Sequence, residues 1–362
     1  MVFHHSLLAL PAAANLSAIP AVGSPIWWLE FTPLKVLTAG NEAVLIFFVL
    51  SGFVLALPVL RAPSYDWVAY YFRRTLRLYL PVIASIALAA IVIYAHPQKS
   101  GNGSSWVDAY SVKSPSWGLF LQSLDIFEPA NAVNNPLWTL RWEMIFSLSL
   151  PLFVFGALLV RRQWALVLVG AVVLVFLGTL KDVSFLLYLP VFFCGAVLAV
   201  NADRLLEWSA RIRGRRGVSI AWLALLLGGC MLLIAHWLLQ PFLLHAVIVD
   251  EFLLSLSFVG AVVIVGVAFL WRPFEAALTV APVRWLGRVS FSLYLVHVPI
   301  ILAFANIFGR GNWLLTIAVA IPVSLVVAEL FARFVEQPAH RLSKRVGSAV
   351  SSRVRSSARA DA

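Results

Sequence analysis

Charged residues are scarce in this chain of 362 residues. Only 12% of them are Asp, Glu, Lys or Arg, and 62% are hydrophobic, whereas soluble domains have about 25% charged residues. The apolar residues form long, continuous runs. Continuous runs exclude an ordinary soluble enzyme, and the lack of alternation with polar residues excludes a membrane β-barrel. The sequence therefore predicts an all-α, polytopic membrane helix bundle.

Acidic residues and cysteines are also few. There are 16 Asp and Glu against 27 Lys and Arg, which gives a net charge of +11. The basic residues stand between apolar runs instead of forming one patch, so they indicate membrane orientation and not nucleic-acid binding. Cys194 and Cys230 lie within apolar runs without metal-ligand spacing. They are interpreted as small core residues, and no metal site is expected.

Ten apolar runs predict about ten transmembrane helices. They cover residues 1–12, 41–60, 74–95, 137–160, 164–180, 183–200, 218–238, 247–270, 286–307 and 313–334. A membrane-spanning helix needs about 20 residues, and the first run is shorter than that. We therefore expect the leading turns of the first helix to lie upstream of Met1.

The basic residues set the orientation, because Lys and Arg near the ends of spans mark the cytoplasmic side. Ten spans with both termini in the cytoplasm place all but six of the 27 Lys and Arg residues inside. The six exceptions are Lys35, Lys99, Lys113, Arg141, Lys181 and Arg310. Residues 1–345 are then expected to form one membrane domain, and residues 346–362 a basic, disordered cytoplasmic tail.

Three arginines stand where the chain enters the membrane, in the segment FRRTLRLYLP at residues 72–81. Arg74 and Arg77 are three residues apart and therefore share one helix face. Two guanidinium groups on one face can hold phosphate groups through paired hydrogen bonds. The alternative is that Arg73, Arg74 and Arg77 only orient the chain or contact lipid headgroups.

Ionisable groups inside membrane spans are costly and often functional. His4 and His5 lie in the first span, and either imidazole could take a proton from a hydroxyl near neutral pH; the alternative is a histidine that only forms a structural contact with a neighbouring helix. Glu143 lies in the segment LWTLRWEMIFSL at residues 137–148, and a carboxylate at that depth must be paired or protonated. A histidine of another span would suit it; the alternative is a structural contact with an arginine or the backbone.

Two further polar sites interrupt the apolar runs. The spacing of Ser290, Tyr294 and His297 places all three on one face of a helix, where they would line an interior cavity or form a packing network. Ser51 precedes Gly52 in FFVLSGFVLALP. Ser51 could line the same cavity, but close helix packing is the favoured role for these two small residues.

Together these segments resemble the acyltransferase-3 family of integral-membrane O-acyltransferases. The matching stretches are FHH at 3–5, FFVLSGFVL at 47–55, RRTLRLYLP at 73–81, LWTLRWEMIFSL at 137–148, GRVSFSLYLVHVP at 287–299 and FVEQPAHRL at 334–342. They occur in the order typical of the family and span almost the whole chain. Arg141 and Trp142 depart from the family pattern, because smaller residues are commoner just before the glutamate.

The resemblance implies a ten-helix enzyme that takes acyl-CoA, expected to be acetyl-CoA, as its cytoplasmic donor. The acceptor would be a hydroxyl of an extracytoplasmic glycan, glycolipid or small molecule. Arg74 and Arg77, with Arg73 beside them, would hold the CoA phosphates. His4 would be the general base, with His5 an unresolved alternative, and Glu143 would support the imidazolium. The expected location is the bacterial inner membrane, in contact with its lipid bilayer.

Two other functions fit some of these features. A transporter or flippase would also carry intramembrane charges, although no inverted repeat is visible and the arginine pair stands at one mouth and not at the midplane. A non-enzymatic membrane scaffold would not require His4, Glu143 and the stripe from Ser290 to His297. Release of CoA from an acyl-CoA by the purified protein distinguishes the enzyme from both.

Overall fold

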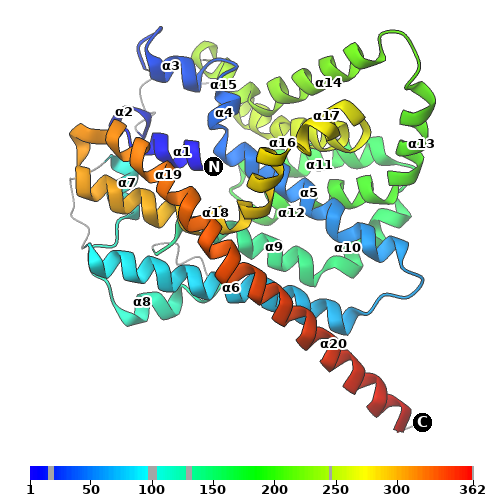
Figure 1. The fold of residues 1–362 in the computed structure, drawn as a ribbon. Helices are drawn as coiled ribbons and strands as arrows, with labels where there is room; N and C mark the ends of the chain where they lie inside the picture. The colour runs from blue at the N-terminus through cyan, green and yellow to red at the C-terminus, as the bar shows by residue number, and fades with distance from the viewer. Residues whose placement is uncertain (15–19, 97–103, 128–132, 244–246, 361–362) are drawn as a thin grey trace. The chain divides into compact units, whose positions relative to one another are not determined.

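The structure is a computed structural model, and it describes all residues except 15–19, 97–103, 128–132, 244–246 and 361–362. The described residues form helices and connecting segments, with no strand among them (Figure 1). The predicted all-α membrane bundle is therefore confirmed as a fold class. Helices dominate because a backbone inside a bilayer must satisfy its own hydrogen bonds.

Five helices are long and apolar enough to cross a membrane, counting only the part of the chain that the structure describes. They are α5 (Gly40–Arg61), α6 (Trp67–Ala95), α16 (Val247–Leu270), α18 (Ala281–Phe308) and the helix that begins as α19 (Trp313–Phe331). Each coincides with a predicted span to within a few residues, except that α6 begins seven residues earlier than its apolar run. The early start is explained by Asp66, whose side chain caps the helix by accepting a hydrogen bond from the amide of Ala69.

Bent helices account for most of the other runs. The pairs are α9 (Trp138–Leu148) with α10 (Leu150–Leu159), α12 (Ser184–Val200) with α13 (Ala202–Ile212), and α14 (Val218–Leu233) with α15 (Ala235–Leu239). Counting each bent pair as one span gives up to eight in the described residues. Helix α11 (Trp164–Leu180) is apolar but only 17 residues long. The number of ten crossings therefore remains a prediction.

The first predicted span is divided into two short helices. Helix α1 (Val2–Leu8) ends before α2 (Pro11–Ala14) begins. Pro11 has no amide hydrogen to continue α1, but its fixed φ suits the first position of a new helix. The remaining short helices are α3 (Pro25–Glu30), α4 (Lys35–Thr38), α7 (Ser105–Tyr110), α8 (Trp117–Gln122), α17 (Arg272–Leu278) and the 3-10 turns η1 (Asn135–Leu137), η2 (Gln240–Phe242) and η3 (Arg310–Asn312).

The chain divides into two compact units. The first unit contains Met1 and residues 19–63 and 148–284; the second contains residues 2–18, 64–147 and 285–362. Each unit is therefore built from segments far apart in the sequence. Of the predicted site residues, only Ser51 belongs to the first unit.

Glycines form the closest helix contact of the first unit. A Cβ atom on Gly52 of α5 would lie 2.1 Å from the carbonyl oxygen of Phe192, and one on Gly195 of α12 would lie 2.1 Å from that of Val49. The rings of Phe48 and Phe192 stack beside them, with centroids 4.4 Å apart. Backbones approach this closely only where side chains are absent. The close-packing role favoured for the Ser51–Gly52 pair thus holds for Gly52, and Ser51 is buried next to it.

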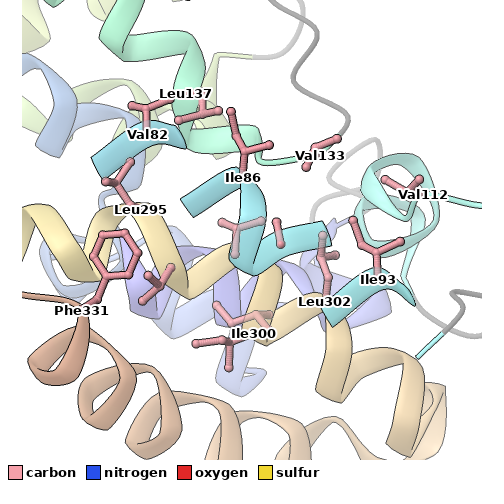
Figure 2. Close-up of a cluster of buried hydrophobic side chains, with 14 of the residues drawn as sticks. Val82, Ile86, Ile93, Val112, Val133, Leu137, Leu295, Ile300, Leu302 and Phe331 are labelled. Carbon is pink, nitrogen blue, oxygen red and sulfur yellow. The ribbon is translucent and has the colours of Figure 1, made fainter. Parts of the chain in front are cut away.

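The second unit has an apolar core between α6 and α18. Val82, Ile86 and Ile93 of α6 meet Leu295, Ile300 and Leu302 of α18, with Leu137 and Phe331 at the edges (Figure 2). These side chains are at most 7% exposed. The core fixes the two helices that carry the predicted arginines and the predicted polar stripe.

The tail differs from the sequence expectation of disorder after residue 345. After α19 a π-helical turn, η4 (Ala332–Glu336), leads into α20 (Gln337–Ala360), which packs along α6 (Figure 1). Gly347 lets α20 approach α6, because a Cβ there would lie 2.6 Å from Cγ of Arg73. The hydroxyl of Ser351 donates a hydrogen bond of 2.6 Å to Oδ2 of Asp66. These contacts explain why a polar, serine-rich segment is helical through Ala360; residues 361 and 362 lie outside the described residues.

Candidate functional site

A pair of histidines lies at one end of the polar interior of the second unit. His5 of α1 is buried, and its Nδ1 lies 2.8 Å from Nε2 of His297 in α18. Trp106 of α7 stacks on the His5 ring, with centroids 5.4 Å apart and an interplanar angle of 17°. The ring of His4 is half-buried and meets His5 edge-on at 5.3 Å. The chain thus brings together two histidines that are 292 residues apart.

The partners of His297 assign the protons on this pair. Nδ1 of His297 lies 2.9 Å from the carbonyl oxygen of Leu293, and a carbonyl can only accept. Nδ1 therefore carries the proton, and Nε2 of a neutral His297 is an acceptor. The proton between the two rings must then belong to Nδ1 of His5. In a neutral His5 this leaves Nε2 unprotonated, which is the state of a general base.

A second group of hydrogen bonds lies next to the histidines along α18. Tyr294 lies one turn before His297 on α18, and its hydroxyl is 2.5 Å from Oγ1 of Thr139 and donates a 2.7 Å hydrogen bond to the carbonyl of Pro136. Nearby, the buried side chain of Asn134 donates to the carbonyl of Leu295 at 2.8 Å. These bonds fasten the start of α9 to α18. Oδ1 of Asn134 has no hydrogen-bond partner among the described residues.

The other end of the polar interior is an ion pair. Glu143 follows Thr139 by one turn on α9, and its Oε1 accepts from Nη2 of Arg74 in α6. Nε of Arg74 donates to Oγ of Ser147 at 2.9 Å, and the hydroxyl of Tyr70 donates to the carbonyl of Ser147 at 3.0 Å. The side chains of Arg74 and Glu143 are only 10% and 6% exposed. Oε2 of Glu143 is buried and has no hydrogen-bond partner among the described residues.

The three predicted arginines have three different environments. Arg77 is exposed, and no hydrogen bond or ion pair engages it in the described part of the chain. Arg73 packs its aliphatic stem against Gly347 of α20. Tyr65, just before α6, lies near Arg73 and Arg74: burial raises the pKa of its phenol, and the two guanidinium groups oppose that rise. Of the three arginines, Arg77 is the exposed one, whereas Arg73 and Arg74 are half-buried.

The three residues of the predicted polar stripe on α18 have different environments. Tyr294 and His297 belong to the polar interior, but Ser290 is exposed and donates to the carbonyl of Gly287 in its own helix at 2.9 Å. No hydrogen bond ties Ser290 to the buried polar side chains in the part of the chain that the structure describes, so its cavity-lining role stays a prediction. The buried serine is Ser292, which donates to Glu336 at 2.5 Å.

Several residues of this interior were not singled out from the sequence. Glu336 lies in the π-helical turn η4, a type of irregularity frequent at functional sites. Glu336 could have been found from the sequence, because an acidic residue next to the apolar stretch that ends in FVEQP is a sign of a functional position. Ser292, Thr139 and Ser147 gave no such signal, because single hydroxyl residues are common in membrane helices. Among the described residues, no three His, Cys, Asp or Glu side chains are grouped so as to hold a metal ion.

The geometry revises two sequence hypotheses. Glu143 pairs with Arg74 and not with a histidine, so the alternative of a glutamate–arginine contact is the one observed, with an arginine of another helix. Of the two neighbouring histidines, His5 forms the hydrogen bond with His297 of α18; which of them is the base stays a prediction. In both cases the partner that the structure shows lies on another helix.

Comparison with known proteins also indicates an acyltransferase. Residues 1–333 match the family model of the acyltransferase-3 family, described as an acyltransferase domain. The chain is 26% identical to the peptidoglycan O-acetyltransferase OatA of Listeria monocytogenes, over 91% of this chain and 55% of that protein. It is 24% identical to acyltransferase R4 of a Phoma species, over 93% of this chain and 87% of that protein.

A third relative is also named as a peptidoglycan O-acetyltransferase. The putative peptidoglycan O-acetyltransferase YrhL of Bacillus subtilis is 25% identical over 92% of this chain and 55% of that protein. The chain thus spans about half the length of the two peptidoglycan O-acetyltransferases. No solved structure matches the chain. Because the family model covers most of its residues, the chain belongs to the acyltransferase-3 family.

Proposed function

We propose that this protein is a membrane O-acyltransferase that moves an acyl group, expected to be acetyl, from cytoplasmic acyl-CoA to a hydroxyl of an extracytoplasmic glycan. Family membership supports acyl transfer. Two relatives named peptidoglycan O-acetyltransferases support an acetyl group and a glycan acceptor. The proposed location is a bacterial inner membrane with both termini in the cytoplasm, as the distribution of basic residues predicts.

The observation that carries the proposal is the hydrogen bond between His5 and His297. It orients a buried imidazole and leaves Nε2 of neutral His5 as the atom able to take a proton. A general base must be held in one tautomer by a fixed partner, as His297 does here. His5 is accordingly the proposed base, in place of the His4 assignment that the sequence favoured.

The proposed step balances with these groups alone. Nε2 of His5 takes the proton of the acceptor hydroxyl, and the oxygen attacks the thioester carbonyl carbon of the donor. The carbon–sulfur bond breaks, the ester forms, and the CoA sulfur leaves with the proton returned by Nε2 of His5. An acyl-enzyme route would instead transfer the acyl group first to a side chain of the protein and then to the acceptor; we propose direct transfer, in a single step.

Arg77 is the proposed contact for the CoA phosphates. It is the exposed arginine of the predicted group, and guanidinium groups bind phosphates through paired hydrogen bonds. Arg74 is proposed to act through Glu143, because their pairing occupies it. Arg73, whose aliphatic stem lies against Gly347, is proposed to support α20 in place of the donor role that the resemblance implied.

The test is an assay of CoA thiol release by the purified protein with acetyl-CoA. Release should require a hydroxyl acceptor, supplied as peptidoglycan fragments or an envelope glycan extract, and the product should carry a base-labile ester. The matched control is His5→Ala, which should retain CoA binding but lose release. A purified protein that releases no CoA with any acceptor, but carries a labelled glycan across a vesicle membrane, would support the transporter instead.

A further inference from the structure

The first unit contains an apolar cavity that the proposed reaction does not use. It has a volume of about 580 Å³, is open on one side, and is lined by α11, α12, α13, α14 and α16. Its walls are aliphatic, as Leu168, Val197 and Val263 illustrate, and Gly266 opens one side. The volume lies within the range of about 300–1,000 Å³ that is typical of small-molecule sites. A cavity with such walls suits a hydrocarbon chain.

One end of the cavity is polar and aromatic. Asn201 and Arg204 lie there with Trp208 and Trp222, whose rings meet edge-to-face with centroids 5.9 Å apart. Tryptophan is enriched where a membrane meets water, because one part of its ring is apolar and its N–H is polar. The cavity therefore combines an apolar body with an interfacial mouth.

Helix α13 forms this mouth. It turns by 63° from α12 at Asn201, and the hydroxyl of Ser209 fixes it to the end of α16 by donating to the carbonyl of Leu270 at 2.8 Å. Its exposed side carries charged residues, and its other side carries the apolar residues that border the cavity. An amphipathic helix of this kind lies along a membrane surface.

The charge at the mouth is positive. The two acids of α13 are each paired with another arginine, Asp203 with Arg61 and Glu207 with Arg211. Arg204 has no ion pair among the described residues. Arg213, Arg215 and Arg216 follow directly in the chain. A guanidinium group at an apolar cavity complements an amphiphile with an anionic head.

We propose that this cavity binds one acyl chain of an anionic membrane phospholipid, with the phosphate of its headgroup at Arg204. Basic residues beside a membrane attract anionic lipids, and a buried chain adds affinity for each methylene that leaves water or detergent. The site is separate from the acyl-transfer residues, all of which belong to the second unit. It is therefore a lipid-binding site of the first unit.

The test fills the cavity. Gly266→Leu adds a side chain at a position where a Cβ meets nothing within 4 Å, so the substitution occupies the cavity without a backbone clash. Gly170→Leu is the matched control: it also meets open space, but Gly170 does not line the cavity. Protein exchanged into detergent with dioleoyl phosphatidylglycerol is measured by native mass spectrometry, and thermal unfolding in detergent checks the fold.

The wild type and Gly170→Leu should each retain one tightly held phosphatidylglycerol, and Gly266→Leu should lose it. Arg204→Gln should weaken retention of phosphatidylglycerol about tenfold and that of phosphatidylcholine less, because the choline cation offsets the phosphate charge that Arg204 attracts. Arg211→Gln is the control for this arm, since Arg211 is paired with Glu207.

Three results would overturn the assignment. Equal retention by Gly266→Leu and wild type would show that the lipid binds elsewhere. An unchanged preference for phosphatidylglycerol in Arg204→Gln would remove the headgroup contact. Displacement of the lipid by palmitoyl-CoA at lower concentration than by free phosphatidylglycerol would assign the cavity to an acyl donor instead.

Discussion

Among the described residues, each unit contains a buried ion pair of a basic side chain with a glutamate, and the two pairs are built differently. In the first unit Lys35 pairs with Glu30, only five residues earlier, and its Nζ lies 3.7 Å from the ring centroid of Trp237. In the second unit Arg74 pairs with Glu143, 69 residues away on another helix. The first pair fastens two short neighbouring helices, α3 and α4, whereas the second joins two long ones.

The pairs also differ in what they leave unsatisfied. No side-chain atom of Lys35 or Glu30 is both buried and without a partner among the described residues, but Oε2 of Glu143 is. A buried carboxylate oxygen without a partner costs free energy, so a purely structural pair would not be expected to keep one. The comparison agrees with a structural role for the local pair and with the proposed role of the long-range pair in acyl transfer.

The largest expected effect comes from the other long-range polar contact of the second unit. His5→Ala should lower the rate of acyl transfer about 10²- to 10⁴-fold, because it removes the proposed general base. CoA affinity should stay within about twofold, since Arg77 is unchanged. Turnover is measured with acetyl-CoA and a glycan acceptor, and CoA binding by calorimetry.

His4→Ala is the control for this experiment. Adjacent helical residues point about 100° apart, and His4 is only half-buried, so its removal should have a milder effect. If His4→Ala abolishes turnover while His5→Ala preserves it, the base is the neighbouring histidine and the contact with His297 is structural.

Replacing both members of each ion pair tests the comparison directly. A buried pair replaced by apolar residues of similar size is often neutral or stabilising by about 1–4 kcal/mol, whereas removing one partner costs about 3–5 kcal/mol. Lys35→Met with Glu30→Leu should therefore keep both fold and activity. Arg74→Met with Glu143→Leu should keep the fold but lose acyl transfer.

The single variants complete this set. Lys35→Ala and Arg74→Ala should both lower the unfolding temperature, since each leaves a buried glutamate without its cation. Unfolding is followed by intrinsic fluorescence in detergent, and activity is expressed per folded molecule. Wild-type activity in the Arg74→Met, Glu143→Leu double variant would mean that both pairs are structural.

A smaller effect is expected at the exposed arginine. Arg77→Ala should weaken CoA binding by roughly 1.5–3 kcal/mol, the value of a charge-assisted hydrogen bond, which is about a tenfold to hundredfold loss of affinity. Arg333→Ala is a suitable control, because Arg333 is another exposed arginine of the second unit. Equal CoA affinities for wild type and Arg77→Ala would remove Arg77 from the donor site.

The smallest effect concerns the first unit, where close packing replaces polar contacts. Gly52→Ala should destabilise the contact between α5 and α12 by about 1–3 kcal/mol, because its new methyl group overlaps the carbonyl of Phe192. Gly170→Ala, in open space, should be neutral or stabilise its helix by up to about 1 kcal/mol. Equal unfolding temperatures for the two variants would show that α5 can shift away from α12.

The positions of the long helices followed from the sequence alone. The apolar runs at 41–60, 247–270 and 286–307 became α5, α16 and α18 with small changes at their ends. A long run of apolar residues has one stable solution in a bilayer, because only a helix satisfies its own backbone hydrogen bonds there. His5, Arg74 and Glu143 could be recognised because they are ionisable residues within or beside these apolar runs. The order of the motifs that contain them along the chain indicated the family.

Only the tertiary structure decided which residues these ionisable side chains contact. His5 meets His297 and Arg74 meets Glu143 across gaps of 292 and 69 residues, and Ser292 faces inward where Ser290 was expected to. A sequence specifies which residues share a face of one helix, but the rotation and depth of each helix depend on how its neighbours pack. In the second unit that packing is set by the apolar core between α6 and α18, so the core determines which polar groups meet.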